Sequence, residues 1–214
     1  MKAIILNIGD EVVSGSVVNT NAAIISQTLE NIGIFVTKTF AVRDNENDII
    51  DIVSAFLNSE ERLLITTGGL GPTHDDITKE VISGVLGLKL EFREEASRSE
   101  YKYSDSKKND CNVKQAYFPE GAKVIKNDFG TADGVYIEIQ NKIIVMLVGP
   151  PYENGPMLEK VLDDLKVYGK KVLFTDFILM GQSESYFENM LEPLLSNNVN
   201  IAPYACNGRV RFRI

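Results

Sequence analysis

The sequence predicts a three-layer α/β domain with a mostly parallel sheet, followed by a small α+β domain. Short apolar runs of strand length alternate with longer segments whose apolar residues recur at helical spacing. Polar, glycine-rich stretches connect these strands to the helices that follow them. Strands and helices that alternate in this way are typical of a parallel sheet covered by helices on both faces.

We assign residues 1–168 to the α/β domain. Its first strand is expected at Ala3–Ile8, then a loop at Gly9–Gly15, and then a helix capped by Asn19-Thr20-Asn21. The other expected elements are strands at 34–42 and 63–66, helices at 44–57, 77–86 and 153–165, a charged helix and loop at 92–112, and a hairpin of 134–139 with 143–148.

Residues 169–214 form the expected small domain. It should contain a strand at 172–180, a helix at 183–195, and strands at 199–205 and 209–214 around Asn207-Gly208. Because the sequence stops inside this last strand, we expect it to be part of a longer protein.

Composition narrows the classes of partner. The 214 residues include 22 basic and 30 acidic side chains, a formal charge of −8, which disfavours nucleic acid and anionic membranes. The only basic cluster, Arg209, Arg211 and Arg213, alternates along one strand and fits a dimer contact better. Two cysteines and the lack of a signal peptide or membrane-length apolar run predict a cytoplasmic protein with free thiols.

The loop from Gly68 to Asp76 is the most informative segment. It follows an apolar strand, precedes a helical pattern, and contains Gly68, Gly69 and Gly71 before the paired acids Asp75 and Asp76. Backbone amides there and the helix N-terminus favour a bound phosphate. The alternative is ordinary capping, because Thr73-x-x-Asp76 also fits a capping box. Capping explains one acid but neither the pair nor the glycines.

Carboxylates in such a loop suggest a hard divalent metal. Asp75 and Asp76 have the oxygen ligands that Mg²⁺ and Mn²⁺ prefer, and such a metal bridges phosphate oxygens and activates water. A single histidine, His74, and the lack of a cysteine cluster disfavour zinc. Asp44 is the third acid; from the sequence alone, the N-cap of the following helix is its better interpretation.

Other polar residues should lie at the same edge of the sheet. Glu11 either contacts metal or ribose or is a surface acid, and Asn21 either contacts ligand or caps its helix. Lys114 either neutralises phosphate or is an ordinary surface lysine. Gly130 and Thr131 either donate to a phosphate or pterin or form a tight turn into a strand.

These motifs resemble the N-terminal region of the competence/damage-inducible CinA proteins, which share the molybdopterin-binding domain of MogA, MoaB and MoeA. The resemblance covers nearly the whole chain. It is carried by 9–15, Val18-Asn19-Thr20-Asn21, 67–80, Lys114-Gln115-Ala116, 130–134 and Gly149-Pro150-Pro151-Tyr152-Glu153.

The resemblance implies metal-dependent hydrolysis of ADP-ribose to AMP and ribose 5-phosphate. Asp76 and Asp44 match an acidic pair associated with catalysis and would hold Mg²⁺, Mn²⁺ or Co²⁺, with Asp75 beside them. Gly68, Gly69, Gly71 and Thr73 would bind substrate with Glu11, Asn21, Lys114, Gly130 and Thr131. The resemblance does not extend to the deamidase domain that full CinA proteins often add. The family's linker domain, which the small domain matches, implies a homodimer.

Two departures from the family pattern affect substrate preference more than the presence of a site. Gly9-Asp10-Glu11 replaces Gly-Thr-Glu, and Val148 replaces a proline. Two further hypotheses therefore stand beside hydrolysis: a molybdopterin-binding or adenylyl-transfer domain, and a non-catalytic nucleotide-binding and dimerisation module.

Overall fold

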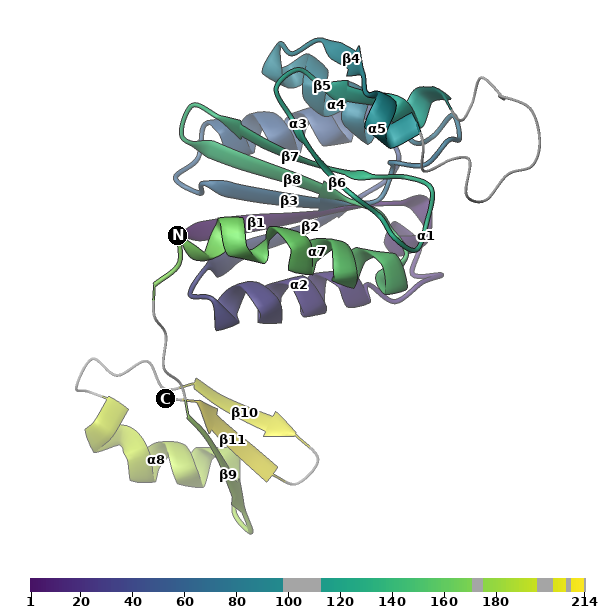
Figure 1. The fold of residues 1–214 in the computed structure, drawn as a ribbon. Coiled ribbons are helices and arrows are strands. Elements are labelled where there is room, and N and C mark those ends of the chain that lie inside the picture. Colours follow the sequence, from purple (N-terminus) through teal and green to yellow (C-terminus); the bar gives the residue numbers. More distant parts are fainter. Residues whose placement is uncertain (98–112, 171–174, 196–201, 207–208, 214) are drawn as a thin grey trace. The chain divides into compact units, whose positions relative to one another are not determined.

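A computed structural model describes residues 1–97, 113–170, 175–195, 202–206 and 209–213. The chain divides into two compact units, Met1–Lys171 and Val172–Ile214 (Figure 1). From the sequence we expect the boundary between the two domains after residue 168. In the described part of the chain, no helix has the length and apolarity needed to cross a membrane.

A six-stranded sheet forms the middle of the first unit. Its spatial order is β2-β1-β3-β8-β7-β6. The first four strands are parallel, whereas β7 is antiparallel to both of its neighbours. The strands are β1 (Lys2–Ile8), β2 (Phe35–Val42), β3 (Leu63–Thr67), β6 (Lys123–Ile125), β7 (Gly134–Ile139) and β8 (Lys142–Leu147).

Helices cover both faces of this sheet. Helices α2 (Thr20–Asn31) and α7 (Pro151–Lys166) lie on one face, and α3 (Glu46–Leu57) and α4 (Thr78–Leu86) on the other (Figure 1). Strand β3 is buried along its whole length, as expected of a strand with helices on both sides. The three-layer, mostly parallel α/β class predicted from the sequence is confirmed.

Several short elements were not predicted. The loop expected at 9–15 contains one helical turn, α1 (Asp10–Val13). The sequence analysis also missed β6, β4 (Leu90–Phe92) and β5 (Tyr117–Pro119), together with the 3₁₀ helix η2 (Lys114–Ala116). Elements of three or four residues are too short to show a hydrophobic period. The helix expected within 92–112 is the short α5 (Glu94–Ser97), and residues 98–112 lie outside the described residues.

The second unit has the expected α+β composition. It contains β9 (Asp176–Met180), α8 (Glu184–Leu195), β10 (Ala202–Cys206) and β11 (Arg209–Arg213). The strands form an antiparallel sheet in the order β10-β11-β9. Its small core contains Phe187, Val210 and Phe212, against which Leu179 and Leu191 pack. The predicted turn Asn207-Gly208 lies outside the described residues.

Lys142 joins several elements at the amino edge of the large sheet. Its Nζ donates to the backbone carbonyls of Phe56, Ser59 and Glu61 at 2.9, 2.8 and 2.7 Å. The same ammonium group lies 4.7 Å from the centroid of the Phe56 ring. Lys142 therefore ties the start of β8 to the end of α3 and to the turn that leads into β3.

A buried carboxylate, Glu61, lies at the same edge. Its Oε1 accepts hydrogen bonds from Thr37 Oγ1 at 2.8 Å and from Lys38 Nζ at 3.2 Å. The neighbouring hydroxyl groups of Ser59 and Thr37 lower the pKa of Glu61 to about 2. The ionised form of this acid therefore stabilises the fold.

Candidate functional site

The loops predicted to carry the site share one edge of the sheet. Ile8 pairs with Val42 and Thr67 with Leu147, so the parallel strands β1, β2, β3 and β8 end side by side. The turn before β7 joins them, because β7 begins where β8 ends. The acids Glu11, Asp44 and Asp76, together with Thr131, therefore follow or precede strand ends at this carboxyl edge, where ligands of open α/β sheets bind.

Asp44 is held by backbone and surrounded by other acids. Its Oδ2 accepts a hydrogen bond from Asp10 N–H at 3.0 Å. The pKa of Asp44 is raised, first by burial and then by the nearby carboxylates of Glu11, Asp75 and Asp10, while the Asp10 amide opposes the shift. Burial and like charges both disfavour the ionised form. Three acids from two other loops thus act on Asp44 here.

The interpretation of Asp44 as a helix N-cap is wrong. Helix α3 begins at Glu46, and its cap is Asn45, whose Oδ1 accepts hydrogen bonds from Asn47 N–H at 3.0 Å and Asp48 N–H at 3.2 Å. The side chain of Asp44 points instead to the preceding loop, so capping does not account for this acid.

Asp76 organises its own loop. Its Oδ2 accepts hydrogen bonds from Thr73 N–H at 2.8 Å and from Thr73 Oγ1 at 2.5 Å. The Thr73 hydroxyl also contacts Asp75 Oδ1, and this contact is the main cause of the lowered pKa of Asp75. A hydroxyl has a single proton to donate, so Asp75 and Asp76 compete for it.

These contacts look like a capping box, yet they do not cap a helix. Helix α4 begins at Thr78, and its N-cap residue, Ile77, makes no side-chain cap. The capping explanation of the Thr73–Asp76 pattern is therefore wrong. The bond from Thr73 N–H to Asp76 closes a loop that ends before the helix.

The glycines allow close packing inside the protein. Gly68 and Gly69 have φ angles of 99° and 68°, which favour glycine. A Cβ atom at Gly68 would lie 2.1 Å from the Ile8 carbonyl oxygen, and one at Gly69 would lie 2.1 Å from Thr78 Oγ1. At Gly71 a Cβ would meet the Asp76 carboxylate at 2.6 Å.

The expectation that the Gly68 amide binds phosphate does not hold. That N–H donates to the Leu147 carbonyl at 3.0 Å and so links β3 to β8. The nearby Thr78 hydroxyl donates to the Gly68 carbonyl at 3.0 Å. Both polar groups of the Gly68 backbone are thus used within the fold.

Lys114, the first residue of η2, contacts the loop that contains Thr73 and Asp76. Its Nζ donates to the carbonyls of Asp76 and, at 3.3 Å, of Thr73, and forms an ion pair with Glu80 at 3.4 Å. The next residue, Gln115, donates from Nε2 to Thr131 Oγ1 at 3.3 Å. Segment 114–115 therefore connects two loops that the sequence analysis proposed for ligand binding.

Three other predicted residues have different surroundings. Glu11 is exposed in α1. Asn21 is buried and donates from Nδ2 to the Gly149 carbonyl at 2.7 Å, while the neighbouring Asn19 caps α2. Gly130 N–H donates to Asn127 Oδ1 at 3.1 Å, and a Cβ at Gly130 would lie 2.0 Å from Glu153 Oε2. Asn21 and Gly130 thus serve internal packing in this structure.

Comparison with known proteins places the chain in a family. The model of a family described as "Probable molybdopterin binding domain" matches residues 4–167. The chain belongs to this family. The matched residues include the carboxyl-edge loops and nearly all of the six-stranded sheet of the first unit.

Named relatives agree with this family. A "putative competence-damage inducible protein" of Thermoanaerobacter pseudethanolicus is 42% identical over 221 residues, covering 100% of this chain and 53% of that protein. The chain therefore spans about half the length of the curated relatives it matches. The crystal structure of CinA from Thermoplasma acidophilum, titled as a protein of unknown function, is 32% identical with a TM-score of 0.72, covering 77% of this chain and 97% of that one.

A more distant structure supports the fold alone. The MoaB protein of Thermus thermophilus, titled a molybdopterin biosynthesis enzyme, has a TM-score of 0.52 at 20% identity. It covers 77% of this chain and 91% of that one. The molybdopterin-binding-type domain and the likeness to CinA-like proteins, both predicted from the motifs, are confirmed.

The acids of this molybdopterin-binding-type domain do not form a closed metal cage. Within the described residues, no three carboxylate, histidine or cysteine side chains converge to hold a metal ion. Mg²⁺, however, is commonly held by one or two carboxylates together with substrate phosphates. Asp44, whose pKa is raised partly by neighbouring carboxylates, and Asp76 have the oxygen atoms that such a shared site would use.

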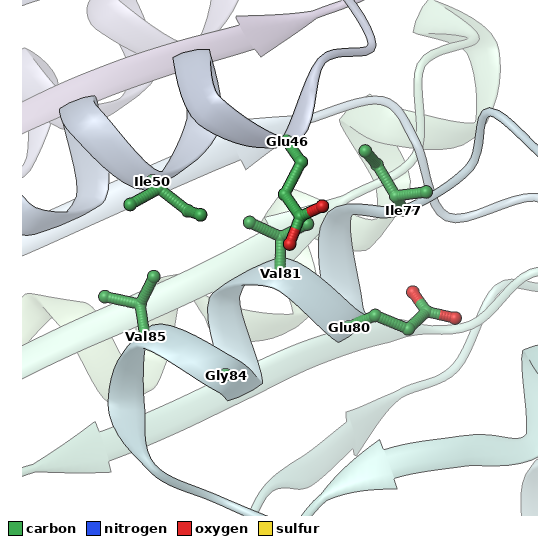
Figure 2. Close-up of a pocket in the computed structure, with 7 residues that line it drawn as sticks. All are labelled: Glu46, Ile50, Ile77, Glu80, Val81, Gly84 and Val85. Atoms are coloured by element: carbon green, nitrogen blue, oxygen red, sulfur yellow. The ribbon is translucent and has the colours of Figure 1, made fainter.

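One cavity of the domain lies beside these loops. It has a volume of about 440 Å³ and lies between α3 and α4 (Figure 2). Its lining is mostly apolar and includes two glutamates; the lining residues are Glu46, Ile50, Ile77, Glu80, Val81, Gly84 and Val85. Asp44, Asp75 and Asp76 are not among these residues, although Glu46 and Ile77 lie within two residues of Asp44 and Asp76 in the sequence.

Sequence reasoning missed one charged residue at the site. Lys79, in the first turn of α4, is only 3% exposed, and its Nζ donates to the Gln115 carbonyl at 2.8 Å. A lysine within an amphipathic helix is normally assigned to solvent. The one available signal was its place next to the Asp75-Asp76 motif.

Proposed function

We propose that the chain is the molybdopterin-type binding domain of a CinA-like protein and that it holds a phosphate-bearing nucleotide or pterin at the carboxyl edge. The observation that carries this proposal is the position of Lys114. Its ammonium group is anchored on the Thr73 and Asp76 carbonyls, beside the acids of the same loop. A ligand phosphate would pair with the Lys114 ammonium group, and a cation bound with the ligand would pair with the carboxylates of the loop.

Other groups support the same assignment. Thr73 offers a hydroxyl that already contacts two carboxylates, and Thr131 offers one held by Gln115. The organic part of the ligand is either a nucleoside or a pterin. Adenylyl transfer would use both, because it attaches an adenylyl group to a pterin. The names of the competence-damage inducible and CinA-like relatives specify neither ligand.

Hydrolysis of ADP-ribose is the second candidate function. The raised pKa of Asp44 favours it, because a divalent cation bound there would relieve the repulsion among Asp44, Asp75 and Glu11. In this proposal Asp44 and Asp76 hold the metal and Asp75 orients water, while Lys114 neutralises phosphate. The metal, Mg²⁺, Mn²⁺ or Co²⁺, would polarise the phosphoanhydride and lower the pKa of the attacking water.

Calorimetric titration with ADP-ribose, ATP and AMP tests binding, and chromatography of the same mixtures with each metal tests turnover. Binding without AMP release supports the binding domain. Metal-dependent AMP and ribose 5-phosphate, abolished by both Asp44→Asn and Asp76→Asn, would establish the hydrolase. ATP consumption only in the presence of a pterin acceptor would indicate adenylyl transfer. No binding of these nucleotides or of the pterin acceptor would refute the proposal.

We further propose a homodimer through the small unit. Residues of β9 leave apolar side chains exposed, Ile178 at 56% and Met180 at 62%, as an interface between copies requires. Sedimentation equilibrium of the whole chain and of Ile178→Lys tests this. A wild-type monomer at micromolar concentration would contradict it.

A further inference from the structure

Lys79 is a buried cation at the edge of the proposed ligand site. Its side chain leaves the first turn of α4 and passes under η2, where Nζ donates to the carbonyls of Gln115 at 2.8 Å and Lys114 at 3.5 Å. The ammonium group also lies 4.5 Å from the centroid of the Phe118 ring in β5. Helix α4 and segment 114–118 are therefore joined through this one group.

This arrangement is costly for the fold. Among the described residues, Lys79 forms no ion pair, and burial lowers its pKa to about 8. Glu80, Lys114, Asp133 and Asp76 are the charged groups that act on it, and the attraction of the three acids does not offset burial. A buried ammonium group without a paired carboxylate lowers stability near neutral pH. Stability alone therefore does not explain a lysine at this position.

Lys79 holds the backbone of η2, from which the side chains of Lys114 and Gln115 reach the proposed site. The carbonyls of Lys114 and Gln115 accept from Lys79, which leaves their side chains to extend to the loops. Lys114 reaches Thr73 and Asp76, and Gln115 reaches Thr131. A shift of η2 would move both contacts together.

We propose that Lys79 is a positioning residue, whose ammonium group fixes η2 so that Lys114 and Gln115 hold the two phosphate-binding loops in place. The assignment to a phosphate site rests on the function proposed above. The fixing of η2 by Lys79 does not, and it is measurable without ligand.

The test uses Lys79→Met, which keeps the length of the side chain and removes the charge. Three results are expected: amide hydrogen exchange in 113–118 faster by about tenfold, a Kd for ADP-ribose higher by about tenfold, and a Tm at pH 7 that is not lowered. A residue with only a stabilising role would lower Tm instead.

Lys142→Met is the matched control. Lys142 also donates to backbone carbonyls and lies over a phenylalanine ring, but at the amino edge. This variant should lower Tm and leave both the exchange of 113–118 and the Kd for ADP-ribose unchanged.

Two results would overturn the proposal. One is unchanged exchange in 113–118 of a folded Lys79→Met protein. The other is a Lys79→Met protein that is unfolded or has a clearly lower Tm, because Lys79 would then be a general stabilising residue. If wild-type protein binds no ADP-ribose, the proposed function fails at that ligand, while the exchange measurement still decides whether Lys79 fixes η2.

Discussion

Lys79 and Lys142 make similar contacts at opposite edges of one sheet, but Lys79 is buried whereas Lys142 is only partly buried. Each ammonium group lies over a phenylalanine ring, and each donates to backbone carbonyls. The carbonyls around Lys142 belong to the end of α3 and the turn into β3, which are parts of the core structure. Those around Lys79 belong to η2, a three-residue segment beside the acidic loops. The same contacts thus stabilise the fold at one edge and position a loop at the other.

The largest loss of stability should come from a substitution at Gly68, where the backbone of β3 meets that of β1 at the carboxyl edge. Gly68→Ala would place a Cβ 2.1 Å from the Ile8 carbonyl oxygen at a φ of 99° and force β1 and β3 apart. We expect a loss of more than about 4 kcal/mol in the free energy of unfolding. Gly87→Ala is the control, since Gly87 also has a positive φ, 68°, but open space around it, and should cost only about 1–2 kcal/mol. Urea denaturation measures both; equal losses would show that the close approach to Ile8 is not the cause.

Loss of Lys142 should be the next largest effect. Lys142→Met leaves three carbonyls without their charged donor, which we expect to cost about 3 kcal/mol and to lower Tm by about 6–12 °C. Calorimetry of this variant beside Lys79→Met compares the two edges directly. If both variants lost the same stability, the contrast between the edges would be wrong.

Glu61 should make the amino edge sensitive to acid. Its pKa is lowered from 4.5 to about 2, so its contribution to stability is complete above about pH 4.5 and is lost as the pH falls towards 2. Glu61→Gln should cost about 2 kcal/mol at pH 7 and much less near pH 2. Denaturant titrations at pH 7 and at the lowest pH where the protein is folded measure this. A pH-independent difference between the two proteins would argue against an ionised Glu61.

The smallest effect is expected at the helix cap next to Asp44. Asn45→Ala removes the acceptor of the Asn47 and Asp48 amides and should cost about 1 kcal/mol. The Kd for ADP-ribose should not change, because Asp44 is held by Asp10 from another loop. A weakened Kd would show that the cap and the acidic site are coupled.

The sequence predicted the elements with a clear period and the edge where they converge. Apolar residues at helical or strand spacing located β1, α2, α3 and β3 within two residues, because each buries one face or both faces against the sheet. The loops that follow these strands lie together because the carboxyl ends of parallel strands share one edge of the sheet. Three-residue elements such as β5 and η2 have no such period and were missed.

Contacts between distant segments explain what the sequence did not predict at the site. The Gly68 amide was expected to be available because its partner, Leu147, is remote in sequence. Asp44 was interpreted as a cap because caps are local and common, whereas its bond to Asp10 depends on the pairing of β1 with β2. Burial of Lys79 depends on a later segment folding over α4.

The hydrogen bond from Gly68 to Leu147 also has a consequence for synthesis on the ribosome. Gly68 leaves the exit tunnel well before Leu147 does, and at a synthesis rate of about 5–20 residues per second the delay between them is about 4–16 s. During that interval β3 has β1 on one side and an open edge on the other. A nascent chain therefore exposes the acidic loop on an incomplete sheet, and only the arrival of β8 fixes the backbone at Gly68.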